Sequence, residues 1–123
     1  MHIYYFEKLE VWQLSRILVK KVYQLSKHLP DDEKFGMISQ IRRAGISITS
    51  NLAEGGSRTS GKEQSRFTEI AFGSLMEVLN LLMIAVDLEY LRQDDLDQVR
   101  PAIGEIGNKL SRLRESQMRK DSK

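Results

Sequence analysis

Apolar residues recur at three- and four-residue intervals along most of the chain, which is the spacing of an amphipathic helix. Residues 7–28 form the first such segment, with an apolar stripe made of Val11, Leu14, Leu18, Val22, Leu25 and Leu29. Pro30 follows this segment, and the residue before a proline disfavours helical backbone, so we expect the helix to end there. No alternating pattern of the kind typical of strands accompanies it.

The second predicted helix begins at Asp31 or Asp32, which are good N-caps, and ends at the Gly55–Gly56 pair. Its core stripe comprises Phe35, Ile38, Ile41, Ile48 and Leu52. A polar seam lies roughly opposite this stripe and consists of Gln40, Arg43, Ser47, Ser50, Asn51 and Glu54. Serine and asparagine are mediocre formers of exposed helix. The seam is therefore either a solvated face or a surface that faces another subunit or a ligand.

The third predicted helix opens with a capping box, Ser60 to Glu63, and continues to about Tyr90. Between Val78 and Leu88 its only polar residues are Asn80 and Asp87. A helix that is apolar nearly all round is buried on more than one side, whereas one small bundle offers a single core. We therefore expect an oligomer, and its candidate interface residues are Leu79, Met83 and Val86, with Ser47 and Asn51 of the polar seam.

The fourth predicted helix starts near Asp94 and carries a stripe of Leu96, Val99, Ile103, Ile106, Leu110 and Leu113. Pro101 lies inside this pattern and predicts a kink or a restart. Residues 119–123 are polar, and we expect them to fray. Four long helices with short connections predict one all-α domain over residues 1–123, an up-down-up-down antiparallel four-helix bundle.

Composition narrows the possible compartments and chemistries. The 123 residues contain no cysteine and two histidines, His2 and His28, so we expect no thiolate or histidine metal site and favour the cytoplasm. Met1–Phe6 has no basic and no apolar signal-peptide region. The longest apolar run, Leu81–Val86, is far shorter than the roughly 20 residues of a membrane span. We expect a soluble protein that does not associate with a membrane.

One stretch matches part of a phosphate-binding loop, but its context favours a simpler interpretation. Gly56, Gly61 and Lys62 have the spacing of that motif. A genuine loop follows a strand and places a hydroxyl residue after the lysine to hold Mg²⁺, whereas here a helix precedes the glycine and Glu63 follows the lysine. A helix end followed by a capping box explains the same residues. Two carboxylate clusters, Asp31–Asp32–Glu33 and Asp94–Asp95–Asp97, also fall at predicted helix starts, where they suit the helix dipole. We expect no enzyme activity and no cofactor.

Charge is segregated, although the net charge is only +2. The predicted topology brings the start of the first helix, the second connection and the end of the fourth helix together. That end has an excess of about four positive charges and the other end about four negative ones. The candidate nucleic-acid-binding residues there are Arg58, Lys62, Arg66, Arg112 and Arg114, and Arg16 and Lys20 add a stripe along the first helix. No aromatic platform stands beside them, so we expect phosphate contacts with little base readout.

Several stretches together resemble one known family, and the likeness extends to about Leu113. They are Phe6–Gln13, Leu29–Glu33, Gln40–Ile48, Ser50–Gly55 and Ile70–Glu77. The chain is similar to the four-helix bundle proteins encoded in intervening sequences of bacterial 23S ribosomal RNA, also called S23 ribosomal proteins. These are related to the accessory variability determinant of diversity-generating retroelements. The resemblance implies a homopentameric bundle without catalysis. For the retroelement branch it also implies binding of nucleic acid and of a reverse transcriptase.

Two functions remain open at this point. The first is an oligomer that binds ribosomal or other structured RNA through the basic end. The second is a protein–protein adaptor or structural oligomer, for which that end is only a charged surface. Binding of structured RNA at moderate salt distinguishes them.

Overall fold

The computed structural model describes residues 1–122 of the chain. Four α-helices make up most of it: α1 is Glu10–Ser26, α2 is Met37–Gly56, α3 is Gly61–Asp87 and α4 is Gln93–Lys120. Two short 3-10 helices, η1 (Tyr5–Lys8) and η2 (Asp31–Glu33), precede α1 and α2. The described residues contain no strand, which confirms the all-α class predicted from the sequence.

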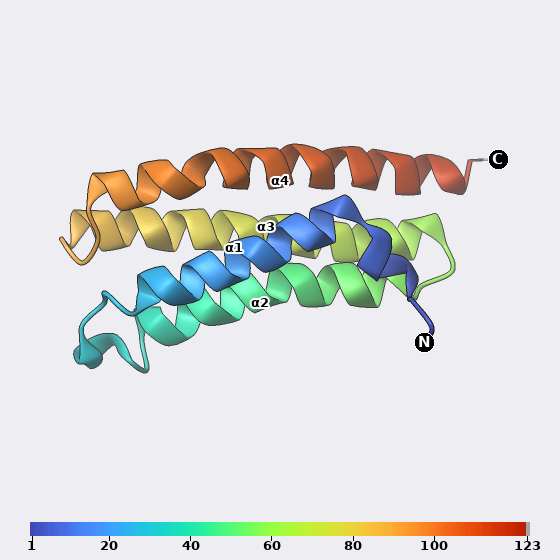
Figure 1. The fold of residues 1–123 in the computed structure, drawn as a ribbon. Coiled ribbons are helices and arrows are strands. Elements are labelled where there is room, and N and C mark those ends of the chain that lie inside the picture. The colour runs from blue at the N-terminus through green and yellow to red at the C-terminus, as the bar shows by residue number, and fades with distance from the viewer. Residues whose placement is uncertain (123) are drawn as a thin grey trace.

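Consecutive helices run in opposite directions, as Figure 1 shows. Helix α1 packs on α2 and α4, and so does α3. In the four-helix bundle, α1 therefore lies diagonally opposite α3, and α2 lies diagonally opposite α4. The chain N-terminus, the α2–α3 connection and the end of α4 therefore lie together at one end (Figure 1). The other end carries the α1–α2 and α3–α4 connections. The predicted up-down-up-down order is thus the observed one.

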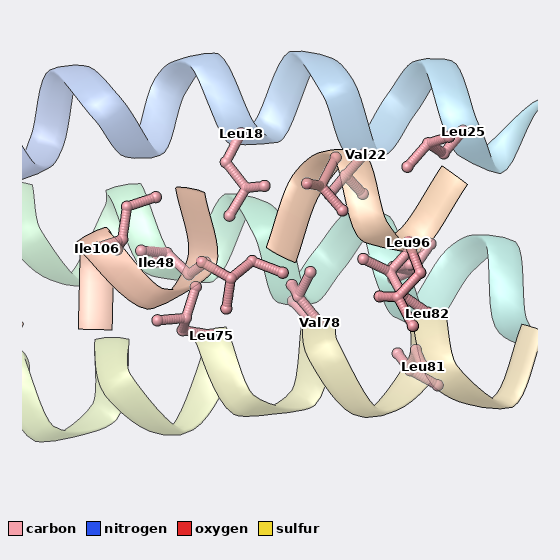
Figure 2. Packing of buried hydrophobic residues seen from close by; sticks show 14 of the residues in the cluster. Leu18, Val22, Leu25, Ile48, Leu75, Val78, Leu81, Leu82, Leu96 and Ile106 are labelled. Carbon is pink, nitrogen blue, oxygen red and sulfur yellow. The ribbon is translucent and has the colours of Figure 1, made fainter. Parts of the chain in front are cut away.

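The core is built from the stripes that the sequence predicts. Figure 2 shows Leu18 and Val22 of α1 pointing toward Ile48 of α2, Leu75 of α3 and Ile106 of α4. All five side chains are at most 2% exposed. Leu14, Ile38 and Leu113 also belong to the predicted stripes; they are partly buried and pack against the core edge.

The start of α2 differs from the prediction. Phe35 is 91% exposed and does not belong to the core. Residues 31–33 form the separate 3-10 helix η2, and α2 begins only at Met37, whose side chain is buried. Gly36, at the N-cap of α2, has φ −108° and ψ −112°, outside the helical region. The chain changes direction there, so Met37 takes the buried position that the stripe pattern gave to Phe35.

Helix α4 continues without a restart through Pro101. Proline removes one backbone N–H and so leaves the carbonyl of Asp97, four residues earlier, without its helical partner. Both residues are exposed, and water can satisfy a carbonyl on an exposed face. The predicted restart is therefore wrong, because the proline lies on the side of the helix where its cost is smallest.

The end of α3 depends on one residue in the left-handed region. Glu89 has φ 65°, and the described chain has no other positive φ at a residue that is not glycine. The N–H of Tyr90 donates to the Ala85 carbonyl and that of Glu89 to the Val86 carbonyl, each at 2.9 Å. This is the Schellman arrangement, which usually places glycine where Glu89 stands.

Replacing Glu89 by glycine is expected to stabilise the bundle by about 0.5–1 kcal/mol. Glycine relieves the cost of the left-handed backbone, although it loses more entropy on folding. The measurement is the urea midpoint at an unchanged m value. Glu89→Ala is the matched control, because it removes the carboxylate but keeps the Cβ, and its midpoint should stay near that of the parent. Equal midpoints for the glycine and alanine variants would contradict the prediction.

Candidate nucleic-acid interface and oligomer face

Segments that carry cationic residues lie together at the end of the bundle that holds the N-terminus (Figure 1). Arg58 lies in the α2–α3 connection, and Lys62 and Arg66 lie in the first two turns of α3. Arg112 and Arg114 lie toward the end of α4. The antiparallel topology thus brings these five predicted residues to one end. We call it the basic end.

Close backbone packing holds α3 and α4 together at this end. Ser60 caps α3, because its Oγ accepts from the N–H of Glu63 at 3.1 Å. A Cβ on Gly61 would collide with the Gln117 carbonyl oxygen, so only glycine permits the observed approach of the two helices. The Asp121 carboxylate accepts from the N–H groups of Gly61 and Lys62 at 2.8 and 2.7 Å. A carboxylate at a helix N-terminus is stabilised by the helix dipole.

The start of the tail that was predicted to fray is helical in the structure and is bonded to α3. Helix α4 extends to Lys120, and Asp121 joins it to the start of α3. The Nζ of Lys120 also donates to the Thr59 carbonyl at 3.2 Å. The sequence pattern could not show this, because both partners lie about sixty residues away along the chain. Lys123, the last residue of the predicted tail, lies outside the described residues.

The cations of the basic end differ in how far they are neutralised. Arg114 forms an ion pair with Glu69 of α3, so its charge is partly cancelled. The guanidinium of Arg58 lies 4.9 Å from the centre of the Phe67 ring. Within residues 1–122, no ion pair engages Lys62, Arg66 or Arg112. All three are exposed, so they carry the electrostatic attraction of this end.

A groove of about 560 Å³ opens at the same end and contains residues that the site prediction missed. It is lined by Tyr5, Gly56, Gln64, Leu113, Ser116, Gln117, Arg119 and Lys120. An aromatic ring, that of Tyr5, thus stands beside cations, contrary to the expectation of no aromatic platform. The predicted topology already placed the N-terminus at this end. The sequence did not show that η1 brings the Tyr5 side chain against the end of α2.

Arg16 and Lys20 lie elsewhere, on the side of the bundle. They border a groove of about 370 Å³ between α1 and α2, together with Val19, Tyr23 and Thr49. The guanidinium of Arg16 lies 4.8 Å from the centre of the Trp12 ring. The predicted nucleic-acid-binding residues therefore form two surfaces. Only the basic end takes its predicted cations from more than one segment, because Arg16 and Lys20 both lie on α1.

The predicted oligomer residues also fall into two groups. On α3, Leu79 and Val86 are partly buried against the core, whereas Met83 is 43% exposed. At helical spacing these three continue a stripe begun by Phe72 and Met76, which are exposed beside α4. We call Phe72, Met76, Leu79, Met83 and Val86 the α3 stripe. It is an apolar surface on the outside of the described chain.

Ser47 and Asn51, the second group, bond within the chain. The Asn51 Nδ2 donates to the Ser47 carbonyl and Oγ, at 2.8 and 3.0 Å. The Ser74 hydroxyl of α3 donates to the Ser47 Oγ at 2.8 Å. These polar atoms therefore connect α2 to α3. Ser47 and Asn51 of the polar seam are therefore not purely solvated, and their polar atoms have partners within the same chain.

Helix α3 carries apolar surface that the described chain does not bury. By length and composition alone it could cross a bilayer, which is weak evidence because core helices of soluble proteins pass the same test. Only 33% of its most apolar 18-residue stretch is buried in the described chain. The remaining apolar surface of the helix includes Met76, Met83 and Ile84, each 39–43% exposed.

Two side chains at the opposite, acidic end have shifted pKa values. The hydroxyl of Tyr90 donates to Glu33 at 3.1 Å, and this bond, with desolvation and nearby carboxylates, raises the pKa of Tyr90. The N–H of Arg92 donates to Asp95 at 2.8 Å and lowers the pKa of Asp95. The stabilising effect of Asp95 is thus present above its unfolded pKa of about 3.9 and is lost as pH falls through the lower folded value.

The chain is similar to known proteins along most of its length. The model of the family described as 23S rRNA-intervening sequence protein matches residues 7–112. A crystal structure of a protein with unknown function from the S23 ribosomal protein family, from Bacteroides thetaiotaomicron VPI-5482, is similar with a TM-score of 0.77 and 24% identity. The match covers 85% of this chain and 95% of that one, and at this identity it concerns the fold alone. The comparison with curated proteins gave no match.

Asp121→Ala is expected to cost about 1 kcal/mol of stability, because two N–H groups at the start of α3 lose their acceptor. The urea midpoint measures the cost, and hydrogen exchange at Gly61 and Lys62 should accelerate. Glu115→Ala is the matched control, since it removes a carboxylate from the same end of α4 without touching α3. Equal effects of the two substitutions would show that the Asp121 contact contributes nothing specific.

Proposed function

The chain belongs to the 23S rRNA-intervening sequence protein family, and from this premise we propose that it is a non-enzymatic, self-associating bundle that binds structured RNA through its basic end. The observation that carries the proposal is that the α2–α3 connection, the start of α3 and the end of α4 lie together (Figure 1), and these segments carry Arg58, Lys62 and Arg112. The family's description refers to an intervening sequence of 23S ribosomal RNA without naming a ligand, and we take structured RNA as the ligand to test.

The exposed cations of the basic end suit phosphate groups. A protein that neutralises phosphates releases condensed counterions, so its affinity rises with the number of cations engaged and falls steeply with salt. Lys62, Arg66 and Arg112 are exposed and without an ion pair in the described chain. Arg114 contributes less than the sequence suggested, because Glu69 already pairs with it.

Self-association would multiply these cations. The α3 stripe exposes apolar side chains along one line of the helix, and burial of such surface drives association. The family resemblance points to a pentamer, in which subunits with a shared orientation present several basic ends side by side. RNA that spans neighbouring ends then contacts more cations than one chain provides.

An absence of catalysis is part of the proposal. The stretch that matches a phosphate-binding loop forms the end of α2 and the capped start of α3. The backbone N–H of Lys62, which would face a phosphate in a genuine loop, donates to Asp121. This arrangement supports a structural role for the motif.

A protein–protein adaptor is the alternative function. A groove of about 320 Å³ between α3 and α4 favours it, because Phe72, Met76 and Leu79 line this groove beside the unobstructed Gly104. The same apolar surface could bind a different protein instead of a second copy. RNA binding by the purified chain distinguishes the two functions.

The double reversal Arg66→Glu and Arg112→Glu is expected to weaken binding of a structured RNA by tenfold or more at moderate salt. The dependence of log affinity on log salt should flatten by about 0.7–0.9 for each phosphate that the variant no longer neutralises. Fluorescence anisotropy over a salt series measures both quantities.

The matched control for that experiment is the double reversal Lys27→Glu and Lys34→Glu. It changes the net charge equally but lies at the acidic end, so affinity should hardly change. Equal reductions in affinity for the two variants would assign the effect to net charge and contradict a defined basic-end site. Strong binding that does not depend on salt would do the same.

Light scattering at micromolar concentration is expected to report a multiple of the 14.2 kDa chain mass, with five as the expected number. Met83→Lys should reduce the assembly to smaller species, because burying a lysine in an apolar contact is unfavourable. Gln24→Lys adds the same charge at an exposed position of α1 and should leave the size of the assembly unchanged. A parent protein that is monomeric under these conditions would refute the proposed self-association.

A further inference from the structure

The groove at the basic end is large enough for a small ligand. Its volume of about 560 Å³ lies within the usual range of ligand sites, roughly 300–1,000 Å³. Its walls come from η1, from the end of α2, from the start of α3 and from the last three turns of α4. A pocket formed by four segments has a defined shape, unlike a cation cluster on one helix face.

Tyr5 is the aromatic side chain of this groove, and its ring is available. It is 55% exposed, and within the described chain it has neither an aromatic nor a cationic partner. The other aromatic residues near cations differ: Trp12, Tyr23 and Phe67 each have an arginine guanidinium over the ring. The Tyr5 ring can therefore accept a ligand face beside the cations of this groove without displacing one of them.

Gly56 keeps the Tyr5 ring against the end of α2. A Cβ at Gly56 would lie 3.2 Å from the Tyr5 Cδ2, tighter than an ordinary contact. The glycine thus lets the ring lie close to the helix, and the position of the ring is defined from one side. A ring that lies against the helix at Cδ2 and is still 55% exposed leaves aromatic surface on which a base can stack.

Cations and amides surround the same space. Lys120 is oriented by its bond to the Thr59 carbonyl, at 3.2 Å, and Arg119 is exposed without an ion pair in residues 1–122. The neighbouring carboxylate, that of Asp121, is bound by the N–H groups of Gly61 and Lys62. The Gln64 Nε2 donates to the Arg58 carbonyl at 2.8 Å, so this amide lies in a fixed position at the groove wall.

From this arrangement we propose that the end groove binds one unpaired nucleotide of RNA. The base stacks on Tyr5, and the adjoining phosphate contacts Arg119 and Lys120. The inference rests on the proposed function and deepens it, because it assigns single-stranded segments of the RNA as the recognised part. Every base has a flat face, so stacking tolerates any sequence, whereas a paired base is already covered by its neighbours.

The test compares three proteins on two RNAs of equal length, an unstructured single strand and a blunt duplex. The proteins are the parent, Tyr5→Leu and Tyr5→Phe, and anisotropy gives the affinity at fixed moderate salt. Tyr5→Leu removes the aromatic face but keeps apolar bulk, and Tyr5→Phe keeps the face. We expect Tyr5→Leu to weaken single-strand binding by about 5- to 150-fold, the range found for removing one stacked base.

Three further readouts make the test decisive. Tyr5→Phe should bind like the parent, duplex affinity should be unchanged in Tyr5→Leu, and the salt slope should be unchanged because the substitution removes no cation. If the parent binds duplex and single strand equally well and Tyr5→Leu changes neither, the end groove proposal is wrong and the basic-end function stands. If the parent binds no RNA at low salt, both proposals fail. Circular dichroism and light scattering confirm that each variant keeps its fold and size.

Discussion

Burial of the apolar residues of α3 is the constraint on which the rest of the structure depends. Ala71, Leu75, Val78, Leu82 and Ala85 are each 0% exposed and follow one another at three- and four-residue spacing, so they form one face of the helix that needs packing partners along its whole length. Helices α2 and α4 supply them, and α1 closes the bundle by packing on both. Because short connections make consecutive helices antiparallel, this packing also places the N-terminus, the α2–α3 connection and the C-terminus at one end.

The topology turns a nearly balanced charge into two distinct ends. A net charge of +2 gives little attraction for nucleic acid if it is spread evenly. Folding brings Arg112 to the same end as Arg58 and Lys62, which precede it by 54 and 50 residues, and Gly61 lets α3 and α4 approach closely. Which of the gathered charges remain effective is decided by ion pairs between helices, such as that of Arg114 with Glu69.

In the proposed function, two physical terms act together at the basic end. Phosphate contacts depend on the number of cations and on salt but not on base identity. Stacking on Tyr5 depends on an exposed base and is nearly independent of salt. The first term can be multiplied by self-association through the α3 stripe, whereas the second belongs to each subunit. A protein with both terms can hold a folded RNA by its backbone and distinguish its single-stranded parts.

The sequence by itself determined the helices, their stripes and the antiparallel order, because the 3.6-residue period reports which face of each helix is buried. It also located the basic end, since topology follows from the short connections. It misplaced Phe35, and of the kink or restart predicted at Pro101 the restart does not occur, because the cost of either residue depends on which side of the bundle it faces. Tertiary structure alone decided the Arg114–Glu69 pair, the Asp121 contact with Gly61 and the position of Tyr5 in the groove. The first two contacts join residues 45 and 60 positions apart, and a local pattern carries no information about partners at that distance.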